Sequence, residues 1–139
     1  MTLIAAINTF TGNISISGIK RVYSLAELKA GVSNPDLPAL IPMVRTGTYN
    51  RETYGATAGA YGDKHSVRFR LLLGSTQTKP FGEALAELAE YAYSFRVAVV
   101  TLDSQQSSIS VEPASYEGDT VDWYGESFFG CDFVVEFIV

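Results

Sequence analysis

The chain has 139 residues and a formal net charge of −5, which suits one domain over residues 1–139 and argues against a basic face that grips nucleic acid by its phosphates. Hydrophobic residues make up 47% of the chain, and charged residues make up 18%, which is below the usual charged content of ~25%. We therefore expect part of the surface to be covered by a partner, although a compact β-rich core would explain the composition as well. One cysteine, Cys131, excludes an internal disulfide. No run resembles a membrane span or a signal peptide, so we expect assembly in the cytoplasm.

The N-terminal third of the sequence favours short elements. Apolar residues at helical spacing predict a short helix or an arm over residues 1–11. Alternation predicts an extended segment over 14–23, with a bend at Gly18, and residues 24–31 fit one or two helical turns. Three prolines between 35 and 42 exclude a helix and a central strand. Residues 38–44 are therefore predicted to be an edge strand that carries Leu40 and Val44 into the core.

Residues 45–64 combine four glycines with three tyrosines and lack a core pattern. A loop of this length in a small domain is usually functional or disordered. The alternative is a long hairpin whose tip extends from the body.

The clearest strand runs over residues 66–73, where apolar and polar side chains alternate, and Gly74 ends it. A helix is predicted over 80–102, with Pro80 in its first turn and Thr78 as its cap. Its apolar stripe comprises Phe81, Leu85, Leu88, Ala92, Phe95, Val99 and Leu102.

The C-terminal part predicts two or three strands, near 109–111, 121–124 and 129–137. The order is strands, one helix, then strands, with little strand–helix–strand repetition. We therefore predict an α+β fold, in which an antiparallel-dominated mixed sheet packs against one long helix (about 80–102) with short additional helices.

Residues suited to catalysis are few. His65 has no partner nearby in the sequence, so a surface polar role is favoured over a general base. Cys131 lies on the apolar face of the last strand and is expected to behave as a small hydrophobe. An acidic group fits a solvated turn better than a calcium loop; it comprises Glu112, Glu117, Asp119 and Asp122. We expect no enzyme activity, no cofactor and no metal.

An aromatic group near the C-terminus is the other notable feature, and it comprises Tyr116, Trp123, Tyr124, Phe128 and Phe129. Such a patch could stack on a sugar or bury itself against a neighbouring protein. Alternate residues of a strand face opposite sides, so about half of the group is expected to be core.

Three stretches together resemble tail terminator and related tail-completion proteins of long-tailed bacteriophages. The first is GIKRVY at 18–23 followed by DLPALIP at 36–42, and the second is the strand 67–73 running into the helix 80–102. The third is the glycine-flanked ending WYGESFFGCDFVV at 123–135. The resemblance implies a small body with a helix-flanked sheet, and no catalytic residue to carry over.

The resemblance also implies partners and a place in the virion. Such proteins form a ring, typically a hexamer, at the head-proximal end of the tail tube, where they stop tube polymerisation and meet the head–tail connector protein. DNA passes through the lumen without specific binding, and an acidic chain is compatible with that role. No membrane is involved.

Two groups of residues are candidates for assembly contacts. The Gly/Tyr segment 45–64 offers Tyr49, Arg51, Tyr54 and Tyr61. The outer side of the predicted helix offers Glu83, Glu87 and Glu90 as a lumen or subunit contact, although a solvated helix face explains them as well. Another head–tail connector, neck or minor tail protein is the first alternative function, and a small carbohydrate- or ligand-binding module is the second.

Overall fold

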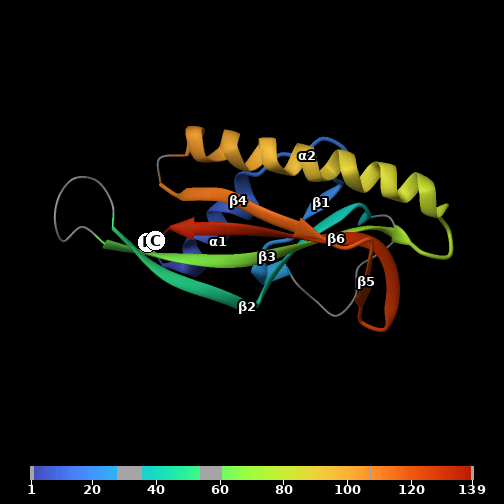
Figure 1. The fold of residues 1–139 in the computed structure, drawn as a ribbon, viewed down its shortest axis with the longest axis horizontal. Helices are drawn as coiled ribbons and strands as arrows, with labels where there is room; N and C mark the ends of the chain where they lie inside the picture. Colours follow the sequence, from blue (N-terminus) through green and yellow to red (C-terminus); the bar gives the residue numbers. More distant parts are fainter. Residues whose placement is uncertain (1, 28–35, 54–60, 107, 139) are drawn as a thin grey trace.

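A six-stranded mixed sheet forms the centre of the protein (Figure 1). The computed structural model describes residues 2–27, 36–53, 61–106 and 108–138, without the side chains of 44–53 and 61–63. The strands are β1 (Arg21–Val22), β2 (Ala39–Thr53), β3 (Tyr61–Ser75), β4 (Ser110–Glu117), β5 (Thr120–Trp123) and β6 (Glu126–Ile138). The α-helices are α1 (Leu3–Asn13) and α2 (Phe81–Gln105), and a short 3-10 helix, η1, spans Leu25–Glu27. The sheet order is β1-β2-β3-β6-β4, with β5 also on β6, and β1–β2 is the parallel pair in an otherwise antiparallel sheet. The predicted α+β class is confirmed.

Helices α1 and α2 pack on the same face of the sheet, where the main core lies. Phe10 of α1 contacts Phe69 of β3 at 4.7 Å between ring centroids, and Phe95 of α2 stacks on Phe133 of β6 at 4.1 Å. All four rings are buried. Burying one such side chain contributes about 1.5–3 kcal/mol, so these pairs fix the positions of both helices on the sheet.

The opposite face of the sheet has an apolar part and a charged part. Near the β1 end a second apolar cluster forms around Ile41, Leu72 and Phe128. The rest of this face is charged, because Arg68 and Arg70 of β3 alternate with the core residues of that strand.

The strand β2 departs in part from the edge strand predicted for 38–44. Ala39 and Leu40 lie between β1 and β3, and Leu40 is buried as predicted. Beyond them β2 pairs with β3 alone, and Pro42 lies in this part, where one side of the strand has no neighbour among the described residues. The side chain of Val44 lies outside the described residues.

Helix α2 confirms most of the predicted stripe and corrects its start. Five of the predicted residues are buried: Leu88, Ala92, Phe95, Val99 and Leu102. Phe81 and Leu85 are exposed, since the packed row begins at Ala84 instead. The predicted Thr78 cap is wrong, because the N-cap is Pro80 without a side-chain bond, and the Thr78 hydroxyl donates to the Ser75 carbonyl.

Candidate assembly surface

The solvent side of α2 carries apolar side chains where a monomer usually places polar ones. Successive helix residues are about 100° apart, so six apolar residues fall in one sector about 120° wide. These six are Leu85, Ala86, Ala89, Tyr93, Val97 and Val100, all exposed and here called the α2 outer face; the polar residues Arg96, Asp103 and Ser104 lie in the same sector. Exposure reaches 70% at Tyr93 and 49% at Val100. A contiguous exposed apolar face of this kind marks an interaction site.

Sequence reasoning missed the α2 outer face, although a signal was present. Tyr93, Val97 and Val100 are among the apolar residues of the helix that the predicted core stripe leaves out. An apolar residue outside the core stripe of an amphipathic helix must face solvent or a partner. The position of these residues outside the stripe therefore predicts an exposed apolar face.

The predicted acidic candidates lie on the neighbouring sector of α2. Glu83 and Glu90 are exposed, whereas Glu87 is half-buried and pairs with Lys79 at 3.1 Å. Glu83 lies in the first turn, where the helix dipole favours a negative charge. The three carboxylates therefore border the α2 outer face along its N-terminal half.

The segment predicted as a loop or a hairpin, 45–64, lies largely in the paired strands β2 and β3. Tyr49 is opposite His65, Arg51 is opposite Asp63, and Thr53 is opposite Tyr61. Since β6 ends beside Lys64, residues 51–53 and 61–63 pair with each other outside the rest of the sheet. Tyr54 lies outside the described residues. Figure 1 shows this two-stranded arm at one end of the molecule and the N-terminal half of α2 at the other, so the two candidate groups are far apart.

The β5–β6 hairpin presents a second exposed aromatic side chain. Tyr124 and Gly125 both have positive φ, as the two central residues of a type I′ turn require. Tyr124 is 67% exposed, and its ring meets the edge of the Trp123 ring at 5.0 Å between centroids. The indole Nε1 of Trp123 is buried and has no acceptor among the described residues.

The predicted aromatic patch is therefore split by the fold. Phe128 and Phe129 are buried on opposite faces of the sheet, whereas Tyr116 and Tyr124 are exposed. This agrees with the expectation that about half of the group would be core.

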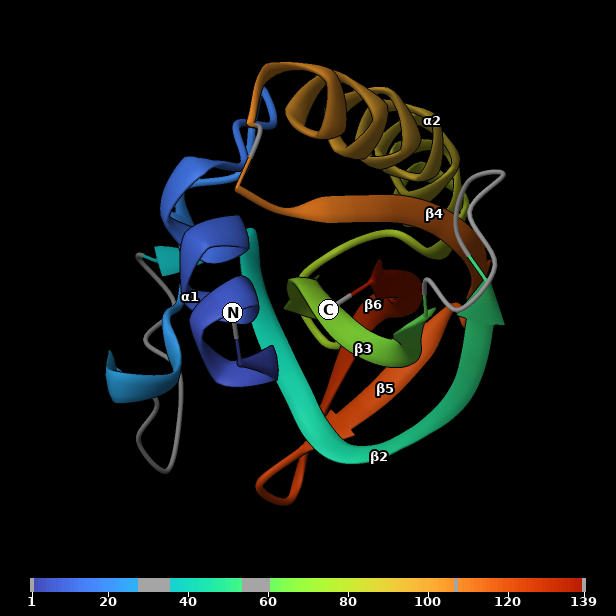
Figure 2. The ribbon, with the colours of Figure 1, turned by 90° about the vertical axis from the view of Figure 1, so that its left-hand side faces the viewer.

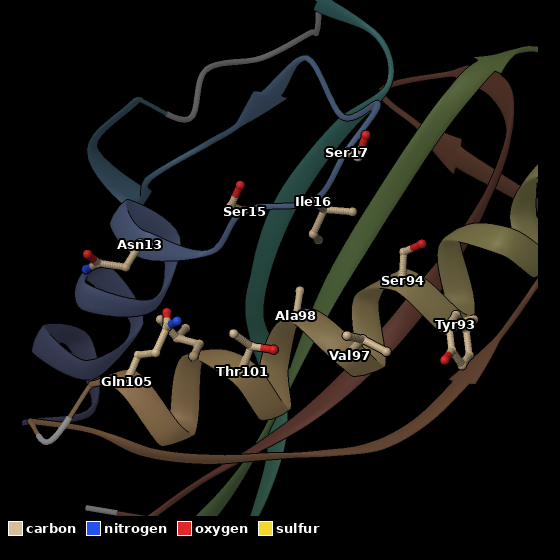
Figure 3. Close-up of a pocket in the computed structure, with 11 residues that line it drawn as sticks. Asn13, Ser15, Ile16, Ser17, Tyr93, Ser94, Val97, Ala98, Thr101 and Gln105 are labelled. Carbon is tan, nitrogen blue, oxygen red and sulfur yellow. The ribbon is translucent and has the colours of Figure 1, made fainter.

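A groove of about 340 Å³ runs beside the α2 outer face, between α2 and residues 13–17 (Figure 3). Ser15, Ile16 and Ser17 line one wall, and the α2 wall includes Tyr93, which also belongs to the outer face. Hydroxyl and amide groups are frequent in its lining, which offers hydrogen bonds to a polar ligand.

On the charged part of the sheet face, basic side chains of β3 form ion pairs with acidic side chains of β4 and β6. Lys64 bridges Glu112 at 2.7 Å and Glu136 at 2.9 Å, and hydrogen bonds to these carboxylates raise the pKa of Lys64. The bond from Lys64 also lowers the pKa of Glu112. Arg70 donates Nε and Nη2 to the two oxygens of Asp132 at 2.8 and 2.9 Å. These pairs cross three strands and hold them in register.

Most of the residues that the sequence offered for catalysis or metal binding are packed in the sheet or held in ion pairs. His65 lies within β3 opposite Phe137, half-buried and in contact with other groups. Burial raises the pKa of the Cys131 thiol to about 12. Glu112 and Glu117, two of the four acidic residues considered for calcium, pair with Lys64 and Arg68. Within the described ranges no three His, Cys, Asp or Glu residues cluster so that they could hold a metal.

Comparison of the chain with models of known protein families and with curated proteins gives no match. Of the helices in the described part of the chain, none combines the length and the apolar content that crossing a membrane requires.

Proposed function

We propose that this protein is a structural subunit of a bacteriophage tail, a tail terminator that closes into a ring at the head-proximal end of the tail tube. The observation that carries the proposal is the α2 outer face, an exposed apolar surface on a well-packed helix. Exposing such a surface permanently in water is unfavourable, and association with another protein removes that cost. The resemblance of 18–23, 36–42 and 123–135 to tail-completion proteins supplies the kind of assembly.

Three features support a ring around DNA. The chain has a net charge of −5, so a lumen lined by it would not retain the phosphate backbone. Glu83 and Glu90 add an exposed acidic border to α2 that suits such a lumen. The β2–β3 arm extends beyond the other strands and could offer its main chain to the tail tube protein or to the head–tail connector protein.

Capping of tail tubes tests this function. The purified protein is added to polymerising tail tube protein, and electron microscopy records the length of the tubes and the density at their ends. We expect shorter tubes that carry one extra ring at a single end. Tubes of unchanged length with bare ends would contradict the proposal, whereas binding to the connector protein alone would favour a neck protein.

The groove beside α2 supports a second candidate, a carbohydrate- or ligand-binding module. Tyr93 lies at its rim and hydroxyl-bearing side chains line it, the combination that a sugar ring requires. Binding of glycans by a protein that remains monomeric would favour this module over the ring subunit.

A further inference from the structure

We infer that copies of this chain join head to tail, with the α2 outer face of one subunit receiving the β5–β6 hairpin of the next. This inference rests on the self-association in the proposed function and names the two surfaces that carry it. The occupant of the α2 outer face is a second copy of the same chain.

The two surfaces lie on opposite sides of the molecule. Figure 1 shows α2 along one side of the body, and the turn between β5 and β6 points away from the other side. Figure 2, turned by 90°, shows the same separation. A contact between two different, opposed surfaces repeats from one subunit to the next, and it closes into a ring when the rotation per subunit allows. A self-complementary contact would instead stop at two copies.

The shapes and polarities of the two surfaces match. Tyr124 projects from a tight two-residue turn, so its ring is presented on a rigid support. On the α2 outer face, the small side chains of Ala86 and Ala89 allow an aromatic ring to approach the helix, and Tyr93 lies one turn further on. Aromatic side chains at the centre of an interface bury the most area for the least lost conformational freedom.

Charge complementarity favours the same pairing. Arg96 lies within the sector of the α2 outer face, is exposed, and makes no ion pair among the described residues. Glu126 directly follows the turn that carries Tyr124, and its carboxylate is in no ion pair within the described part of the chain, whereas Asp122 faces the other side of the hairpin, beside Arg70. The cation of Arg96 and the carboxylate of Glu126 therefore favour an orientation in which the hairpin lies at the Arg96 edge of the α2 outer face, away from Glu83, Glu87 and Glu90 at the other edge.

Single-surface variants of the full chain test the inference. Tyr93→Ser removes the centre of the α2 outer face, and Tyr124→Ser removes the tip of the hairpin. We expect each variant alone to remain monomeric in native mass spectrometry, with subunit association at least tenfold weaker than in the wild type. An equimolar mixture should form heterodimers and nothing larger, because one intact surface of each kind remains. Ile4→Ser, which changes an equally exposed apolar side chain on α1, is the control and should assemble normally.

Charge reversal gives an independent readout. Arg96→Glu and Glu126→Arg should each weaken assembly, and the double variant should recover it. Circular dichroism and thermal melting verify that every variant is folded.

The outcomes separate this inference from the proposed function. Wild-type rings that persist in both tyrosine variants, or dimers formed by Tyr124→Ser alone, would overturn the head-to-tail contact and leave the ring proposal standing. A wild-type chain that stays monomeric beside tail tubes would remove the proposed function itself.

Discussion

Gly130 occupies the closest approach between two central strands. A Cβ atom at this position would collide with the backbone carbonyl of Leu71 on β3, next to the irregularity in pairing between Leu72 and Gly74. The clash involves main chain rather than a flexible side chain, so β3 and β6 would have to separate.

We expect Gly130→Ala to lower the free energy of unfolding by about 3 kcal/mol or more, since overpacking of this kind forces backbone shifts. Gly12→Ala is the matched control, because nothing lies within 4 Å of a Cβ there and the residue is helical. That control should stabilise the protein by about 0.5–1 kcal/mol. Urea unfolding of the two variants measures both changes, and equal stabilities would contradict the close approach.

Cys131 should be inert in the folded protein. Burial raises the pKa of its thiol to about 12, so at pH 8 only about one molecule in ten thousand carries the reactive thiolate. A disulfide-exchange reagent should therefore label the native protein at the rate of unfolding and label it at once in denaturant. Immediate labelling of the native protein at pH 8 would show that the last strand is accessible.

The ion pair between Lys64 and Glu112 predicts a pH-dependent stability. The pKa of Glu112 is lower in the folded state than its unfolded value of about 4.3, so its contribution is present above that pH and is lost as the pH falls through the folded pKa. Glu112→Gln should lower the free energy of unfolding at pH 7 by less than about 1 kcal/mol, because half of the Glu112 side chain is exposed. Thermal melts at pH 7 and pH 2 provide the comparison. A difference that persists unchanged at pH 2 would assign the effect to packing rather than to charge.

At the scale of elements, the strands and the helix with a strong hydrophobic periodicity could be predicted from the sequence. The alternating residues of β3 and β6 and the helical spacing of Leu88, Ala92 and Phe95 identified those elements correctly. The start of the buried row at Ala84 was not predictable, because it depends on where the helix meets the sheet rather than on spacing. The glycines and tyrosines of 45–64 carry no alternation, so the sequence left both a loop and a long hairpin open; the pairing of β2 with β3 out to Thr53 and Tyr61 agrees with the hairpin.

The candidate site was predictable only in part, for the same reason. Glu83, Glu87 and Glu90 were placed correctly on the helix from spacing alone. The same spacing excludes Tyr93 and Val97 from the core stripe, but this signal was overlooked; the structure shows both exposed, opposite the buried Phe95 and Val99.

The β2–β3 arm permits a test of its role that spares the core. Asn50 and Lys64 are register partners, so residues 51–63 can be replaced by an Asn-Gly turn that joins them. The replaced segment includes Arg51, Tyr54 and Tyr61, and its paired residues 51–53 and 61–63 lie beyond the end of β6, outside the rest of the sheet. We expect the free energy of unfolding to change by about 0.5 kcal/mol or less and assembly with tail tubes to be lost.

Circular dichroism and a tube-capping assay provide the two readouts for the shortened arm. Loss of folding would show that the arm belongs to the core. Normal capping by the shortened protein would exclude Arg51, Tyr54 and Tyr61 as assembly contacts.

At the scale of the whole molecule, the account depends on two exposed surfaces that point in opposite directions from a firmly packed body. The aromatic contacts among Phe10, Phe69, Phe95 and Phe133 keep those surfaces in a fixed relation. A fixed relation is what turns a pairwise contact into a ring with a defined number of subunits rather than a mixture of sizes.

Native mass spectrometry of the wild-type protein across a range of micromolar concentrations, with and without tail tubes, tests this central claim most directly. We predict one closed assembly, a hexamer of six times the subunit mass, that forms with increasing concentration or on contact with the tubes. A single subunit mass under every condition, tubes included, would contradict the account.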